Sequence, residues 1–238
     1  MWDNATLLRS IANALIAFSV MAALYGAISY TVRLPGLFPL HSVQLSAPPQ
    51  RVAAAKVLQA VREAANGNFF TVDVDRVRQA LEKQPWVRAV SIRREFPDRL
   101  VVRLEEHQAL ARWNQSALVN RQGEIFTADS EQLLPGFTGP DSASAEVAQQ
   151  YLQLSKQLAP LNLQVAQLAL SARYAWQLRL NNGMVLELGR EDMQQRLERF
   201  VAVQRTEGRG LRTEGGVTYV DLRYRNGFAV RQITNVKG

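Results

Sequence analysis

The residues that could perform catalysis or hold a metal ion are scattered along this chain. Its two histidines, His41 and His107, have no metal-ligand spacing. Glu105 and Glu106 are adjacent, so on a strand their side chains point to opposite faces and cannot form a paired-carboxylate site. Asp73 stands where a helix should begin, and capping explains it. We therefore expect a protein that is not an enzyme and uses no metal or cofactor.

Composition argues against other kinds of chemistry. The chain has no cysteine, which removes a disulfide framework and thiolate catalysis. The net charge is +7, but the basic residues are spread along the chain and form no dense Lys/Arg stripe. We expect neither a nucleic acid nor a small-molecule substrate. A basic exterior suits anionic lipid or an acidic partner.

An uncharged run, "SIANALIAFSVMAALYGAISYTV", occupies residues 10–32. As a helix it would span about 34 Å, and a hydrocarbon core is about 30 Å thick. A cleaved signal peptide is the alternative, although its apolar region is usually shorter. We predict an uncleaved transmembrane helix at 10–32, after a cytoplasmic tail, 1–9, and before a Pro/Gly-broken stem, 33–39.

Residues 40–108 have the pattern of a small domain with the order β-α-α-β-β. A strand is expected at 40–47 and a helix over 51–65, and a second helix must end before Pro85. Two alternating runs follow, joined by a turn at Pro97-Asp98. The first run puts three apolar side chains on one inward face: Val90, Ile92 and Phe96.

Residues 109–238 read as a mostly antiparallel β domain with inserted helices, so the fold class is α+β. Arg173–Leu180 alternates between apolar and polar residues, which places Arg173 on the polar face of a strand. Asn182-Gly183 suits a type I′ turn, in which both central residues have positive φ. A final hairpin, "TYVDLRYRNGFAVRQ", spans 218–232 around Asn226-Gly227.

The last strand of that hairpin, roughly Phe228–Ile233, has little chain after it to cover its outer backbone. An earlier strand could still cover it, or Arg231 could simply keep an ordinary edge monomeric. If it is uncovered, its N–H and C=O groups form a template for strand addition by a partner.

Several long runs carry a resemblance to a known family. They include "GNFFTVDVDRVRQALEKQPWVRAVSIRREFPDRLVVRLEEHQALARW", "NRQGEIF", "SARYAWQLRLNNG", "RLERFV" and "YVDLRY". In this order, after an apolar segment, they resemble the bacterial division protein family FtsQ/DivIB with its POTRA domain. The resemblance implies a POTRA domain at 40–108 and a C-terminal β domain at 109–238 that docks FtsB-like and FtsL-like membrane proteins.

The resemblance also implies which residues contact partners. In the C-terminal domain they are Arg173, Tyr224, Asn226, Gly227, Phe228 and Gln232; at position 232 the family can have Trp, so an aromatic anchor there is in doubt. In the POTRA domain the matching strand contains Ile92 and Arg94, where further division proteins could bind. Periodicity favours core packing for Ile92.

The predicted function is that of a non-enzymatic scaffold at the division septum. The chain would cross the inner membrane once, with its N-terminus in the cytoplasm and its bulk in the periplasm. One alternative is a POTRA-bearing component of a secretion or outer-membrane assembly system, which would have tandem POTRA units or a β-barrel. Another is an anchored cell-wall enzyme, which would need a catalytic constellation.

Overall fold

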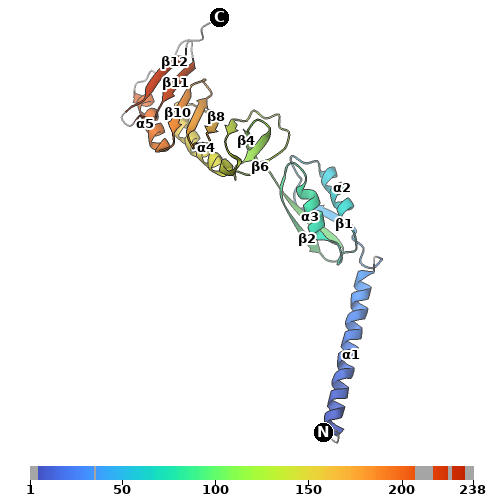
Figure 1. The fold of residues 1–238 in the computed structure, drawn as a ribbon. Coiled ribbons are helices and arrows are strands. Elements are labelled where there is room, and N and C mark those ends of the chain that lie inside the picture. The colour runs from blue at the N-terminus through green and yellow to red at the C-terminus, as the bar shows by residue number, and fades with distance from the viewer. Residues whose placement is uncertain (1–4, 35, 207–216, 225–226, 234–238) are drawn as a thin grey trace. The chain divides into compact units, whose positions relative to one another are not determined.

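The chain folds as one long helix followed by two mixed α/β regions, as a computed structural model shows (Figure 1). The structure describes residues 5–34, 36–206, 217–224 and 227–233. It separates into two compact units, Met1–Glu106 and His107–Gly238.

Helix α1, Ala5–Arg33, contains the uncharged run. Its segment Leu8–Arg33 has a mean hydropathy of 1.9 and is long and apolar enough to cross a membrane. The rest of the protein leaves its large apolar side chains uncovered, which is the arrangement expected of a helix surrounded by lipid.

The rest of the first unit is a three-stranded sheet covered by two helices. Its strands have the order β1-β3-β2, with β1 parallel and β2 antiparallel to β3. The predicted order β-α-α-β-β is confirmed, and its elements are β1 Ser42–Leu45, α2 Ala54–Ala64, α3 Val74–Glu82, β2 Val87–Glu95 and β3 Arg99–Glu106.

Local chemistry explains the ends of these elements. The Asp73 side chain caps α3 by accepting hydrogen bonds from the backbone N–H groups of Asp75 and Arg76. The Glu106 carboxylate accepts three backbone N–H groups at 50–52. Burial alone would raise the pKa of Glu106, but these three donors hold it below its ordinary value.

One prediction for this unit is wrong. Val90 is buried and Ile92 packs against the core, but the side chain of Phe96 is 73% exposed. Strand β2 ends at Glu95, so Phe96 belongs to the turn that follows it and the strand alternation no longer applies.

The second unit is built on a nine-stranded sheet with the order β12-β11-β10-β9-β8-β7-β4-β5-β6. Most pairs are antiparallel, but β10 with β11, β4 with β7, and β7 with β8 are parallel. Its strands are β4 Ala109–Trp113, β5 Ala117–Asn120, β6 Ile125–Phe126, β7 Gly136–Thr138, β8 Val165–Leu170, β9 Trp176–Leu180, β10 Val185–Gly189, β11 Val217–Asp221 and β12 Ala229–Ile233.

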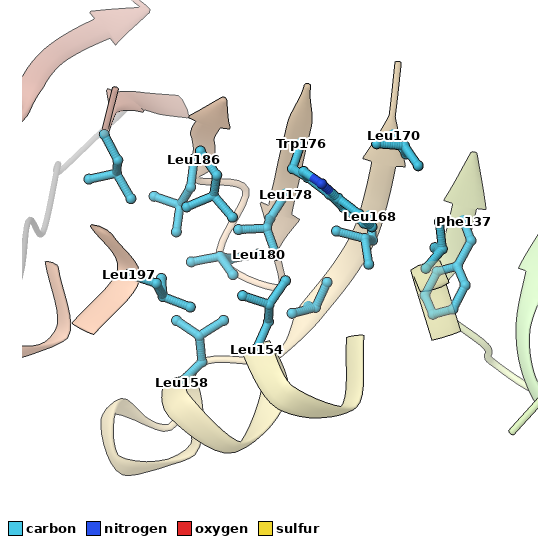
Figure 2. Packing of buried hydrophobic residues seen from close by; sticks show 14 of the residues in the cluster. Phe137, Leu154, Leu158, Leu168, Leu170, Trp176, Leu178, Leu180, Leu186 and Leu197 are labelled. Atoms are coloured by element: carbon cyan, nitrogen blue, oxygen red, sulfur yellow. The ribbon is translucent and has the colours of Figure 1, made fainter. Parts of the chain in front are cut away.

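Helices α4, Ser144–Leu158, and α5, Met193–Thr206, pack on this sheet, and short 3-10 turns flank α4. Figure 2 shows Leu154 and Leu158 of α4 pointing at strand side chains such as Leu178. The alternation in β9 supplies that face, since Trp176, Leu178 and Leu180 are buried while the residues between them are exposed. The packing of these helices against the buried strand side chains holds the central strands of the sheet in place.

Two turns differ from their predictions. Strand β9 begins at Trp176, so Arg173 lies in an exposed turn, and the next residue, Tyr174, has φ 59°. In the β9–β10 turn only Gly183 has positive φ, because the loop is one residue longer than a type I′ turn. Leu180 N–H donates to the Met184 carbonyl and Gly183 N–H donates to the Leu180 carbonyl, as in a type I turn followed by a left-handed glycine.

Candidate functional site: the terminal edge of the large sheet

Strand β12 forms one end of the nine-stranded sheet. It pairs with β11 from Val217↔Ile233 to Asp221↔Ala229. In the part of the chain that the structure describes, no strand pairs with its other side. Strand β11 lies inside, between β12 and the parallel strand β10. The predicted terminal hairpin therefore ends in an open edge, by which we mean the outer backbone side of β12.

The ladder determines which backbone groups face the open edge. Leu222 N–H donates to the Glu187 carbonyl of β10, so the even-numbered residues of β11 direct their backbone groups to β10. Asp221 and Tyr219 then face β12, where they pair with Ala229 and Arg231.

Alternation along β12 consequently turns the N–H and C=O groups of Val230 and Gln232 outward. These four groups form the template that an added strand would use. Ala229, by contrast, bonds to β11. The N–H of Ala229 is therefore not available to an added strand.

The side chain of Val230, beside the open edge, is accessible. Val230 pairs with Val220, yet Val230 is 45% exposed while Val220 is fully buried. Next to the hairpin turn, a hollow of about 530 Å³ lies between α5 and the hairpin. Its lining is Arg196, Arg199, Ala202, Val203, Leu222, Gly227 and Phe228. An added strand could therefore bring apolar side chains into contact with α5.

An ion pair between the buried Asp221 and the exposed Arg223 side chain holds the end of β11 in place. The Arg223 guanidinium donates to both carboxylate oxygens of Asp221, at 2.9 and 2.7 Å, and Arg223 N–H also donates to this carboxylate. The hydrogen bond from Arg223 keeps the pKa of Asp221 below its ordinary value, against the effect of burial. Gly189, with φ 75°, lies against Arg223 and Arg196, where a Cβ would come within 3.0 Å of both side chains. These contacts hold the end of β11 against the end of β10.

Most of the predicted contact residues lie at one end of the sheet. Trp176, which follows the Arg173 turn, pairs with Gly189 at the end of β10, and β10 runs parallel to β11. The Arg173 turn, residues 222–224 and residues 227–228 are therefore at the same end of the sheet, where β9 is two interstrand spacings from β11 and three from β12, or about 10 and 14 Å. Tyr224 is 57% exposed, and Phe228 packs against Phe200 of α5 with 5.8 Å between ring centroids.

The remaining predicted residues are placed differently. Asn226 lies outside the described residues, and of Gln232 only the backbone, in β12, is described. Ile92 and Arg94 belong to the first unit. Ile92 is half-buried against the POTRA core, and Arg94 donates a hydrogen bond to the Val72 carbonyl.

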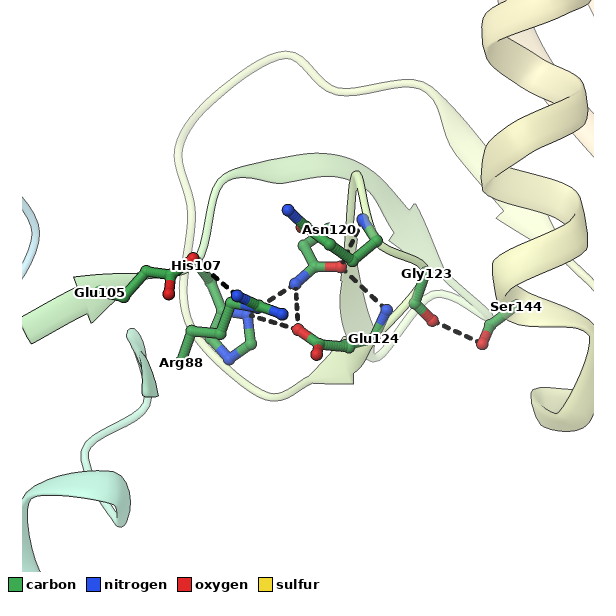
Figure 3. A network of polar contacts seen from close by, with 8 residues as sticks. Arg88, Glu105, His107, Asn120, Gly123, Glu124 and Ser144 are labelled. Carbon is green, nitrogen blue, oxygen red and sulfur yellow. Dashed lines mark hydrogen bonds and ion pairs between the residues drawn. The ribbon is translucent and has the colours of Figure 1, made fainter. Parts of the chain in front are cut away.

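At the opposite edge of the sheet, polar contacts hold the turn that leads into β6 (Figure 3). The fully buried Asn120 side chain accepts hydrogen bonds from the N–H groups of Gln122 and Glu124 and donates to the Glu124 carboxylate. Ser144 of α4 donates to the Gly123 carbonyl at 2.6 Å. His107 stacks on Phe126 with 4.1 Å between ring centroids.

Sequence reasoning missed the outward groups of Val230 and the hollow beside α5. Neither has a local signal, because both depend on the parallel pairing of β10 with β11 across the segment that contains α5. Among the described residues, no group of three or more His, Cys, Asp or Glu could hold a metal ion.

A β-α-α-β-β unit after one helix that is long and apolar enough to cross a membrane, followed by a second unit built on a large mixed sheet, is the architecture of a POTRA-containing protein. Family models agree with this architecture. Residues 38–107 match the POTRA domain of FtsQ type, and residues 111–223 match the C-terminal domain of the cell division protein FtsQ/DivIB.

Curated relatives extend the match over nearly the whole chain. A protein named cell division protein FtsQ from Nitrosospira multiformis is 42% identical over 97% of this chain and 99% of its own length. Proteins of the same name from Bordetella pertussis and Burkholderia pseudomallei are each 38% identical over 97% of this chain, and over 92% and 94% of their own lengths. The chain belongs to the FtsQ/DivIB family of cell division proteins.

Proposed function

We propose that this chain is a non-enzymatic scaffold of the division septum that captures an FtsB/FtsL-like membrane complex by β-strand addition at the open edge of β12. The observation that carries the proposal is the outward direction of the backbone groups of Val230 and Gln232 on an edge strand whose outer side meets no other strand among the described residues. An incoming strand would satisfy these groups, and its side chains would provide selectivity.

The residues around the edge suit this role. Tyr224 offers an exposed aromatic ring, the kind of side chain that often dominates the binding energy of an interface. Arg173 supplies an exposed positive charge at the same end of the sheet, where it could pair with an acidic partner side chain. Ile92 and Arg94 would belong to a separate contact of the POTRA domain with other division proteins.

Anchoring strengthens such an interaction. With α1 in the inner membrane, the N-terminus in the cytoplasm and the folded units in the periplasm, a partner confined to the same membrane binds at a raised effective concentration. Fusion of alkaline phosphatase after residue 238 should give active enzyme, since this reporter works only outside the cytoplasm. An abundant but inactive fusion would reverse this topology.

Site-specific crosslinking tests the docking itself. Because the chain has no cysteine, a single Cys can be introduced without background. Val230→Cys at the open edge should crosslink to cysteines along the periplasmic C-terminal segment of an FtsB-like protein. The matched control is Thr127→Cys, an exposed position just after β6. Equal crosslinking at both positions, or none at Val230→Cys despite co-purification, would refute docking at β12.

A further inference from the structure

Four apolar side chains converge at the end of the POTRA domain where the chain leaves α1. Leu37 and Phe38 come from the stem, Phe70 from the α2–α3 connection, and Phe96 from the β2–β3 turn; all four are exposed. The ring of the buried Phe69 meets those of Phe70 and Phe96 edge-on at centroid distances of 5.1 and 6.2 Å, and the Phe38 ring meets that of Phe70 at 5.1 Å. We call these four exposed residues the membrane-proximal patch.

The sheet topology explains why these segments meet. Strands β1 and β3 are parallel and start together, with Ser42 opposite Arg99. The stem before β1 and the turn before β3 are therefore at the same end of the domain. His41 N–H donates to the Asp98 carbonyl, and Phe69 N–H donates to the Phe38 carbonyl, which adds the α2–α3 connection to this end.

Asn68 connects the same end to the last turn of α1. Its side chain is 1% exposed, and its amide nitrogen donates to the carbonyls of Val32 and Leu34. Its amide oxygen accepts from the N–H groups of Phe70 and Thr71. The carbonyls at the end of a helix lack partners within the helix, so this side chain acts as a C-terminal cap supplied by the POTRA domain.

We propose that the membrane-proximal patch inserts into the headgroup layer of the membrane that α1 crosses, so that the POTRA domain rests on the lipid surface. The inference requires α1 to span the membrane, as in the proposed function, but no partner protein. If α1 leaves the hydrocarbon core near Arg33, the segments bonded to Val32 and Leu34 lie within the headgroup layer, which is about 6 Å thick on each side.

The chemistry of the patch fits lipid as its occupant. Aromatic rings concentrate at membrane interfaces, and soluble surfaces seldom gather several exposed apolar side chains from separate segments. Basic groups stand close by. Arg33 ends α1, and Arg94 is held at the α2–α3 connection by its hydrogen bond to Val72, so both could meet anionic headgroups.

Depth measurements on the full chain in lipid nanodiscs, without any partner, test this inference. Single cysteines replace Glu95, beside the patch, and Lys83, an exposed residue after α3 at the opposite end of the domain. Each carries a fluorophore, and lipids with a nitroxide headgroup act as the quencher. We expect quenching to be about threefold stronger at position 95, because the patch enters the headgroup layer.

A variant of the membrane-proximal patch distinguishes insertion into the headgroup layer from a position that is merely close to α1. Phe70→Ser with Phe96→Ser should lower the quenching at position 95 toward that at 83, whereas Leu133→Ser, an exposed apolar residue of the second unit, should not. Circular dichroism confirms folding, and Phe96→Ser alone serves if the double variant unfolds. Equal quenching at 95 and 83 in the unsubstituted patch, or quenching at 95 that folded patch variants leave unchanged, would overturn the inference. Neither result would bear on docking at β12.

Discussion

The two edge strands of the large sheet, β6 and β12, differ in length and in the contacts beside them. Strand β6 is only two residues long, and Asn120, Glu124 and Ser144 bond its flanking turn to the rest of the domain. Strand β12 is five residues long, and Val230 and Gln232 direct their backbone groups outward. Short length and bonded turns are ways to prevent strand pairing, whereas a long accessible edge permits it.

The comparison separates an edge whose contacts should stabilise the fold, at β6, from an edge that could bind another chain, at β12. Beside β6, the polar groups of the flanking turn are bonded within the chain. At β12, Asp221 and Arg223 fix the end of β11, but the outer backbone pairs with no strand in the described part of the chain. Changes at β6 should therefore affect folding, and changes at β12 should affect capture of a partner.

The largest effect is expected for Val230→Pro. Proline lacks the outward N–H and its ring obstructs an added strand, whereas an edge position tolerates it because that N–H is not part of the ladder to β11. Partner affinity should fall by more than about a hundredfold, or about 3 kcal/mol, as measured by titration calorimetry.

Two further variants control this result. Val230→Ala keeps the N–H and should retain most of the affinity. Arg231→Pro removes a donor that faces β11, so it should unfold the hairpin as well as abolish binding. If Val230→Pro binds as well as the unsubstituted chain, the open edge is not the docking site.

At the closed edge, Asn120→Ala should reduce stability and leave capture unchanged. The fully buried Asn120 side chain and its hydrogen bonds from the N–H groups of Gln122 and Glu124 are lost, which costs about 2 kcal/mol in the free energy of unfolding. Denaturant titration measures the loss. An unaltered midpoint would show that the Asn120 network does not secure β6.

Tyr224→Ala should weaken capture by about tenfold, since an aromatic anchor at an interface contributes about 1–2 kcal/mol. The ring is more than half exposed, so the thermal midpoint should change little. Full affinity in a folded Tyr224→Ala variant would remove this side chain from the proposed interface.

Acidic pH should loosen the open edge, whereas neutral pH should leave it intact. The pKa of Asp221 is lowered in the folded protein, so its ion pair with Arg223 contributes stability above the ordinary carboxyl pKa. That contribution is lost as the pH falls through the lowered pKa. Exchange protection of β11 and β12 should therefore be constant from about pH 7 to 5 and decline below about pH 4. Asp221→Asn should remove this component of the pH dependence.

The smallest effect is expected for Arg173→Ala. This side chain lies in an exposed turn, where an ion pair contributes only about 0–1 kcal/mol. The change should slow association at low salt and have little effect at high salt. A loss that is large and independent of salt would instead indicate a desolvated pair.

Local patterns predicted the elements of the POTRA unit and the terminal hairpin, because helix capping, Pro85 and strand alternation act over a few residues. Phe96 was misplaced because alternation continued past the end of β2 into a turn. Arg173 was misplaced for the corresponding reason at the start of β9. Which backbone groups of β12 face outward depends on the distant pairing of Glu187 with Asp221, and no local pattern contains that information.

Amide hydrogen exchange resolved by NMR at the four positions 229–232 tests the central claim most directly. In the free chain, Val230 and Gln232 should exchange fast, while Ala229 and Arg231 are protected by β11. Adding the FtsB-like segment should protect Val230 and Gln232 and leave Ala229 and Arg231 as they were. Tight binding with no new protection at Val230 and Gln232 would contradict strand addition at this edge.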